Sequence, residues 1–210
     1  MMAIKKIIEW ILPPIAIIGI SGFFLWQTNE REVNSRVDYE NGIPKSNIAK
    51  EVQRDFESYQ CNVIQILDGD SLNVNCDGKE LRLRLCGIDA PEQKQHFGEE
   101  STNKLRQLAY LNKGQVAITK IELDRSGRTI AEVNVWSGRV IPNYGREYLL
   151  INSELIRAGL AYHYKEFSSN CHNKYFIGIA EDEAIANKVG VWSNKEEKPW
   201  DYRKRMLSPK

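Results

Sequence analysis

Five side chains in one short stretch of the sequence combine acids and arginines at a spacing that could support chemistry. They are Asp70, Arg82, Arg84, Asp89 and Glu92. Carboxylate oxygens bind hard cations such as Ca²⁺ and Mg²⁺, and guanidinium groups pair with phosphoryl oxygens through two parallel hydrogen bonds. A further carboxylate can take a proton from an attacking water molecule. Together with Arg128 further along the chain, these residues indicate phosphate-ester chemistry, and a surface network of ion pairs is the alternative.

A β-hairpin is predicted to lead into this stretch. Residues 63–67 and 71–74 are strand-like runs, and the Asp-Gly pair between them is a strong signal for a hairpin turn. If the turn has two residues, Cys61 lies opposite Cys76, at the Cα separation of about 4.5 to 5.5 Å that a disulfide spans. We therefore predict a Cys61–Cys76 disulfide, with two free thiols as the alternative. The other two cysteines are too far apart in sequence for a local argument to pair them.

A strand over residues 81–86 is predicted to present the arginines. Its three leucines alternate with Arg82, Arg84 and Cys86, so the leucines share one face and the arginines share the other. The leucine face is predicted to join the core. The arginine face is then directed into a cleft or into solvent, and a turn fixed by Pro91 follows the strand.

The rest of the sequence contains further strand-like and helix-like runs. Predicted helices cover residues 98–112, 153–158 and 175–188, the second of them capped by Asn152, and predicted strands cover residues 116–122 and 130–136. Arg128 lies in the turn that joins these two strands. Short strands clustered early, with helices between and after them, predict a strand-rich barrel with helices packed on it.

An apolar run at residues 7–26 is long enough to cross a membrane. A helix of this length, at ~1.5 Å per residue, spans about 30 Å, which is one hydrocarbon core. Trp10 and Trp26 are placed to mark the two interfaces. We predict an uncleaved single-pass anchor after a short segment 1–6, followed by a polar tether over residues 27–60 and a domain outside the cytoplasm, periplasmic or extracellular. A cleaved signal peptide and a buried helix are the alternatives.

The charge of the chain as a whole is nearly balanced. Lys and Arg number 29 and Asp and Glu number 28 in 210 residues, which gives a net charge of +1 at pH 7. A global basic field is therefore excluded, and any site for a polyanion must be a local cluster. The three histidines lie at no metal-binding spacing and are predicted to be ordinary surface or loop residues.

Several longer motifs follow one another along residues 61–192. They are D-G-D-S-L-N-V, L-R-L-R-L-C-G-I-D-A-P-E, D-R-S-G-R, N-S-E-L-I-R-A-G-L-A and G-V-W. In this order they resemble the staphylococcal nuclease (thermonuclease) family. The resemblance implies an α+β, mainly β, fold: a five-stranded OB-fold barrel with three helices, here preceded by the transmembrane helix and followed by a tail at 193–210. It also implies Ca²⁺-dependent hydrolysis of DNA and RNA to products ending in 3′-phosphate.

The same resemblance gives most of these residues a role. Asp70 and Asp89 would bind Ca²⁺ together with the backbone carbonyl of Ala90, Arg84 and Arg128 would hold and polarise the phosphate, and Glu92 would act on the attacking water. Arg82 receives no role. The expected partners are DNA and RNA, preferably single-stranded, and the membrane through the N-terminal helix, with no obligate protein partner evident. The alternative is a non-catalytic, membrane-tethered module of the same family that binds nucleic acid.

Aromatic residues close to the end of the domain are further candidates for nucleic-acid contacts. Tyr162, Tyr164 and Phe167 could stack on bases, and ordinary packing is the alternative for each of them. In the tail, Trp200 is predicted to pack back on the domain ahead of a basic R-K-R end. A frayed terminus is the alternative there.

Overall fold

The computed structural model describes residues 39–40, 43–44 and 58–208. In the N-terminal part, the short strands β1 (Tyr39–Glu40) and β2 (Ile43–Pro44) pair with each other in antiparallel fashion. The anchor predicted at residues 7–26 and most of the predicted tether lie outside the described residues. Among the described residues no helix is long and apolar enough to cross a membrane.

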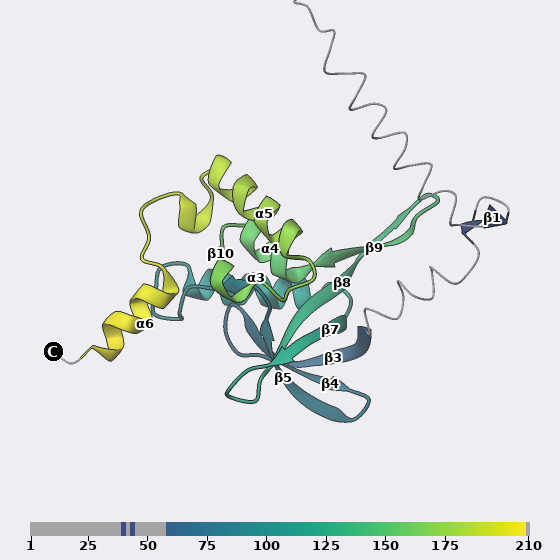
Figure 1. The fold of residues 1–210 in the computed structure, drawn as a ribbon, viewed down its shortest axis with the longest axis horizontal. Coiled ribbons are helices and arrows are strands. Elements are labelled where there is room, and N and C mark those ends of the chain that lie inside the picture. The colour runs from purple at the N-terminus through teal and green to yellow at the C-terminus, as the bar shows by residue number, and fades with distance from the viewer. Residues whose placement is uncertain (1–38, 41–42, 45–57, 209–210) are drawn as a thin grey trace, which may run out of the picture. The chain divides into compact units, whose positions relative to one another are not determined.

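The domain is built on a closed β-barrel (Figure 1). Its main sheet has the order β5-β4-β3-β7-β8-β9, and β5 also pairs with β8 in parallel, so β3, β4, β5, β7 and β8 form a ring. The strands are β3 (Ser58–Ile66), β4 (Ser71–Cys76), β5 (Lys79–Leu85), β7 (Gln115–Leu123), β8 (Thr129–Ile141) and β9 (Gly145–Leu150). This ring agrees with the five-stranded barrel expected from the sequence.

Helices gather on one side of the barrel (Figure 1). The three predicted helices correspond to α3 (Gly98–Ala109), α4 (Ile151–Arg157) and α5 (Lys174–Ala186), and the tail forms one more, α6 (Pro199–Leu207). The core between the barrel and the first three helices includes Leu72, Leu83, Ile118, Leu105, Leu155 and Ile177, all fully buried. At about 25 cal/mol per Å² of apolar surface, burial of such side chains supplies most of the folding free energy.

The predicted alternation in β5 is confirmed. Leu83 and Leu85 are buried in the core, and Leu81 packs against it from a partly buried position. Arg82 is exposed, whereas Arg84 is only partly so and points into a cleft. The two arginines differ in exposure because the segment after β5 covers Arg84, which donates to the Ile88 carbonyl and to Asp89.

The hairpin of β3 and β4 carries a bulge that the sequence did not reveal. Next to the turn, Ile66 pairs with Leu72, one residue away from the register that a two-residue turn would give. An extra residue, Ile64, sits between two paired positions and restores the predicted register beyond it. Cys61 and Cys76 therefore lie opposite each other with a Cα separation of 4.3 Å, and the predicted disulfide joins them.

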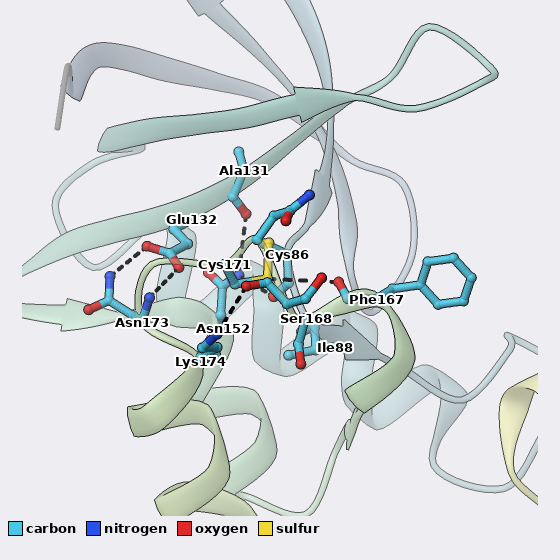
Figure 2. Close-up of a disulfide and its surroundings, with 12 residues drawn as sticks. Cys86, Ile88, Ala131, Glu132, Asn152, Phe167, Ser168, Cys171, Asn173 and Lys174 are labelled. Atoms are coloured by element: carbon cyan, nitrogen blue, oxygen red, sulfur yellow. Dashed lines mark hydrogen bonds between the residues drawn. A yellow bond between two sulfur atoms is a disulfide. The ribbon is translucent and has the colours of Figure 1, made fainter. Parts of the chain in front are cut away.

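Asn152 does not cap α4, contrary to the prediction. The helix begins at Ile151, and Asn152 lies within its first turn, fully buried against the barrel. Its side-chain oxygen accepts a hydrogen bond from the Val133 amide at 3.1 Å, and its side-chain nitrogen donates to the carbonyl oxygens of Cys86 and Ala131 at 3.0 and 3.3 Å (Figure 2). These bonds satisfy backbone groups where β5 leaves the sheet, so Asn152 fixes α4 onto the barrel.

Candidate active site

Two aspartates from different elements meet around one arginine. Asp70 directly precedes β4, and Asp89 ends the short strand β6 (Ile88–Asp89). Arg84 forms an ion pair with Asp70 through Nη1, and its Nη2 lies 2.7 Å from Asp89 Oδ1. The side chains of Asp70 and Asp89 are 4% and 0% exposed. Charged groups are buried only when they are paired. Asp70, Asp89 and Arg84 therefore stabilise one another in this position.

Backbone and hydroxyl donors complete the surroundings of Asp70. Its Oδ2 accepts a hydrogen bond of 2.7 Å from the Ala90 amide, and its Oδ1 accepts one of 3.2 Å from the Ser71 hydroxyl. The structure thus brings Asp70, Asp89 and the Ala90 amide together. Their role as metal ligands, which involves the Ala90 carbonyl, stays a prediction.

Glu92 lies at the edge of the same site, beside an arginine that the sequence did not assign. Arg203 of α6 donates from Nη1 to Glu92 Oε1 at 2.7 Å and from Nη2 to Asp89 Oδ2 at 2.7 Å. Burial works against the charged guanidinium, but the hydrogen bonds from the two carboxylates outweigh it and raise the pKa of Arg203. The signal for this residue was present in the basic R-K-R run, which was predicted as a basic end after Trp200 and was given no role in the site.

Arg128 faces the same cleft from the start of β8. Its Nε donates to Asp124 Oδ2 at 2.6 Å. Partial burial tends to raise the pKa of Asp124, but the hydrogen bonds from the Arg128 side chain and backbone hold that pKa below its ordinary value. The carboxylate therefore stays ionised and restrains a guanidinium that is still about one-third exposed to the cleft.

A cleft of about 770 Å³ joins these groups. Its lining includes Asp70, Arg84, Ala90, Glu92, Arg128 and Arg203, together with Tyr164 and Phe167 on one wall. Asp89 lies behind this lining, fully buried. Arg82 is absent from the lining, which agrees with the lack of a role for it. The cleft presents arginines from three separate parts of the fold: β5, the turn before β8, and α6.

The aromatic wall is partly exposed and partly structural. Phe167 ends the short 3₁₀ helix η1 (Lys165–Phe167) and is 60% exposed, with its ring 4.6 Å from that of Tyr164. Tyr162 is buried and packs edge-on against Trp200, and burial raises its pKa to about 12. Of the three aromatic candidates, Tyr164 and Phe167 reach the cleft, whereas Tyr162 belongs to the packing behind it.

A second disulfide holds this wall. Cys86, next to the end of β5, is joined to Cys171, four residues after Phe167, and the Phe167 ring projects away from the bridge (Figure 2). The Tyr164 amide also donates to the Gly87 carbonyl at 2.8 Å. The segment that carries Tyr164 and Phe167 is therefore tied, covalently and by backbone, to the strand that carries Arg84.

The donor set at Asp70 and Asp89 fits a hard cation. The carboxylates of Asp70 and Asp89 both contact the Arg84 guanidinium, and their oxygens are ligands of the kind that Ca²⁺ prefers. No cluster of three acidic, histidine or cysteine side chains among the described residues is close enough to hold a metal by itself. A cation here would need the Ala90 carbonyl and water molecules to complete its six to eight ligands.

Comparison with known proteins places the chain among its relatives. The family described as "Staphylococcal nuclease homologue" matches residues 82–194. The chain belongs to the staphylococcal nuclease family. This confirms the resemblance found in the sequence, and the match spans Arg84, Asp89, Glu92 and Arg128 of the cleft. Asp70 lies before the matched segment and forms an ion pair with Arg84 inside it.

Individual members of the staphylococcal nuclease family resemble the chain over most of their length. An "Uncharacterized endonuclease" of Escherichia coli O157:H7 is 31% identical over 68% of this chain and 84% of its own length. A "Micrococcal nuclease" of Shigella flexneri is 30% identical over 71% of this chain and 83% of its own length. A "Thermonuclease" of Staphylococcus hyicus is 32% identical over 63% and 75% of the two chains.

Proposed function

We propose that this chain is a Ca²⁺-dependent endonuclease that hydrolyses DNA and RNA to products ending in 3′-phosphate. Membership of the staphylococcal nuclease family makes it a phosphodiester-hydrolysing enzyme. The observation that carries the proposal is the placement of Arg84 between two buried aspartates, in a cleft that also presents Glu92 and Arg128. Carboxylates that could hold a cation, beside two arginines that could hold a phosphate, suit a phosphodiester substrate.

Each residue of the cleft then has one task. Asp70, Asp89 and the Ala90 carbonyl would hold Ca²⁺, which when bound polarises a phosphoryl oxygen as a Lewis acid. Arg84 and Arg128 donate to the phosphate oxygens and stabilise the charge that builds up there in the transition state. Glu92, whose side chain is 39% exposed, accepts the proton of the attacking water at its carboxylate.

The outcome of the reaction follows from which bond breaks. Water attacks phosphorus and gives up a proton to Glu92, the bond from phosphorus to the 5′ oxygen breaks, and the phosphate stays on the 3′ oxygen. The departing 5′ oxygen takes up a proton from water and leaves as a hydroxyl. In-line attack requires water and leaving oxygen on opposite sides of the phosphate. Positioning of the phosphate between Arg84 and Arg128 supplies this orientation without a covalent intermediate.

The proposed substrate is a single strand. Unstacked bases can lie on exposed aromatic rings, and base stacking of this kind contributes about 1–3 kcal/mol per base. Phe167 offers such a ring at the rim of the cleft, supported by Tyr164 beneath it. Because every base has a stacking face, the wall would tolerate many base sequences.

The place of action is also a proposal. All four cysteines are joined in two disulfides, and disulfides persist mainly outside the reducing cytosol. This supports an extracytoplasmic location for the domain. The anchor at residues 7–26 is proposed from the sequence alone.

One assay tests the proposed function. The full chain, purified in detergent, is incubated with labelled single-stranded DNA or RNA in Ca²⁺ and then in EDTA, and product ends are identified by mass spectrometry. We expect cleavage to products with 3′-phosphate in Ca²⁺ and none in EDTA. Binding without cleavage in Ca²⁺ would instead identify the non-catalytic, nucleic-acid-binding alternative.

A further inference from the structure

The C-terminal helix α6 places a third guanidinium against the acids of the cleft. Arg203 Nη1 lies 3.1 Å from Asp89 Oδ1 and 2.7 Å from Glu92 Oε1, and its Nη2 lies 2.7 Å from Asp89 Oδ2. One planar group therefore contacts both oxygens of a buried carboxylate and one oxygen of its half-exposed neighbour. Such a fork fixes geometry as well as charge, because its N–H directions are rigid.

Specific contacts hold α6 at this position. The Trp200 ring stacks on Tyr164 with a centroid distance of 5.0 Å and an interplanar angle of 9°. Ahead of the helix, Gln95 Nε2 donates to the Glu197 carbonyl at 2.8 Å. Residues three apart on a helix share a face, so the docking of Trp200 directs Arg203 toward the acids.

The three acids of the cleft differ in what restrains them. Asp70 and Asp89 are buried and share Arg84, whereas Glu92 follows a proline turn and is 39% exposed. The ion pair with Arg203 ties the Glu92 carboxylate to Asp89, the fully buried acid. A reaction in which a general base must contact one water molecule slows when the position of that base varies by even an ångström.

We propose that Arg203 is a positioning residue of the active site, which holds the Glu92 carboxylate at a fixed place relative to Asp89. The proposal rests on the proposed function, since it assigns Arg203 to the same reaction. Arg203 acts through Glu92 and Asp89, and the helix that carries it is part of the site. By this proposal, residues that follow G-V-W, the last of the sequence motifs, are also needed for full turnover.

The charge of Arg203 gives the proposal a distinctive test. A guanidinium in contact with Asp89 repels a cation bound by the same carboxylate. Removal of the charge should therefore favour Ca²⁺ binding, while loss of the fork lets Glu92 move and slows turnover. A variant that only destabilised the fold would instead show weaker Ca²⁺ binding and slower turnover together.

The experiment compares variants of α6 in the full chain. Arg203→Met removes the charge at similar length, Arg203→Lys keeps a charge without the fork, and Arg205→Met is the matched control, because Arg205 pairs with Glu197 at the surface at 2.9 and 2.8 Å. The measurements are kcat and KM on single-stranded DNA, the Kd for Ca²⁺ by calorimetry without substrate, and the melting temperature in EDTA.

We expect Arg203→Met to lower kcat by about 10- to 100-fold, the range usual for residues that orient a site, with KM changed less than kcat. Its Kd for Ca²⁺ should be equal to or tighter than that of the wild type. Arg203→Lys should bring the Kd back toward the wild-type value and recover only part of kcat. Arg205→Met should match the wild type within about twofold, since surface pairs contribute little.

Two outcomes overturn the proposal. A kcat for Arg203→Met that falls by less than about tenfold means that Glu92 needs no such support. A weaker Kd for Ca²⁺, with a lower melting temperature, means that Arg203 only stabilises the fold. If the wild type cleaves nothing in Ca²⁺, the proposed function fails, whereas the calorimetry still decides whether Arg203 acts on the cation site through Asp89.

Discussion

Replacement of Arg84 by methionine is the most direct test of the buried charge arrangement. Arg84→Met leaves Asp70 and Asp89 close together without the group that joins them. Breaking a buried ion pair by removal of one partner costs about 3–5 kcal/mol. Here the lower end applies, because Asp89 keeps Arg203 and Asp70 keeps hydrogen bonds from Ser71 and Ala90. We expect a loss of about 3 kcal/mol in the free energy of unfolding without metal.

Urea unfolding in EDTA, followed by circular dichroism, measures this loss. The unfolding midpoint should fall with the slope unchanged, since the same surface is exposed on unfolding. For a domain of this size, about 3 kcal/mol corresponds to a drop of roughly 6–12 °C in melting temperature. Arg139→Met is the control, because Arg139 pairs with Glu147 at the surface, at 2.6 Å. That variant should unfold at the wild-type urea concentration.

Ca²⁺ provides the second half of the test. A ligand at 100 times its Kd stabilises the folded state by about 2.7 kcal/mol. In Arg84→Met the freed carboxylates repel each other, so a cation relieves more strain there than in the wild type, and Ca²⁺ should narrow the difference in stability. If Arg84→Met unfolds at the wild-type midpoint in EDTA, the aspartates are not held by Arg84 and the reasoning from buried ion pairs is refuted.

Three further predictions concern the base, the second disulfide and a buried histidine. Glu92→Gln should lower kcat by about 10²- to 10⁴-fold with an unchanged Kd for Ca²⁺ by calorimetry; near-normal initial rates would exclude Glu92 as the base. Cys86→Ser combined with Cys171→Ser opens a loop of sequence separation 85 and should cost about 4–5 kcal/mol in urea unfolding, with a variant as stable as the wild type contradicting this. Burial lowers the pKa of His163 below its ordinary value of 6.5, so below about pH 6.5 the unfolded chain takes up a proton before the folded protein does. Stability should therefore fall as the pH drops from there, and equal pH dependence in His163→Gln and the wild type would rule this out.

The parts of the fold that depend on local patterns were predictable. The alternation in β5 required only the two-residue period of a strand and a core on one side, so Leu83 and Arg84 were placed correctly. Asp70, Asp89 and Glu92 were identified from one stretch because the chain brings them together with few intervening residues. Arg128, which lies in a turn far from them in sequence, was a candidate by residue type, and the family resemblance gave it its role on the phosphate.

What depends on contacts between distant segments was not predictable. Asn152 has the residue type of a helix cap, and only the position of the barrel shows that it instead serves Val133 and Cys86. The partner of Cys86 is Cys171, at a separation that no local rule reaches. Trp200 was predicted to pack back on the domain, and its stacking on Tyr164 confirms this. That this docking brings Arg203 to Asp89 and Glu92 depends on the path of α6 across the cleft, which no local pattern predicts.

The bulge at Ile64 has a consequence for how this hairpin can change in evolution. A shift of one residue in a strand moves every following side chain to the opposite face. On one side of the bulge the register places Leu72 in the core next to Asp70, and on the other side it places Cys61 opposite Cys76. Deletion of one residue would displace one of these features. Relatives that lack the extra residue should therefore also differ in turn length or lack the cysteine pair. A deletion in this hairpin should thus be accompanied by a second change that restores one of the two registers.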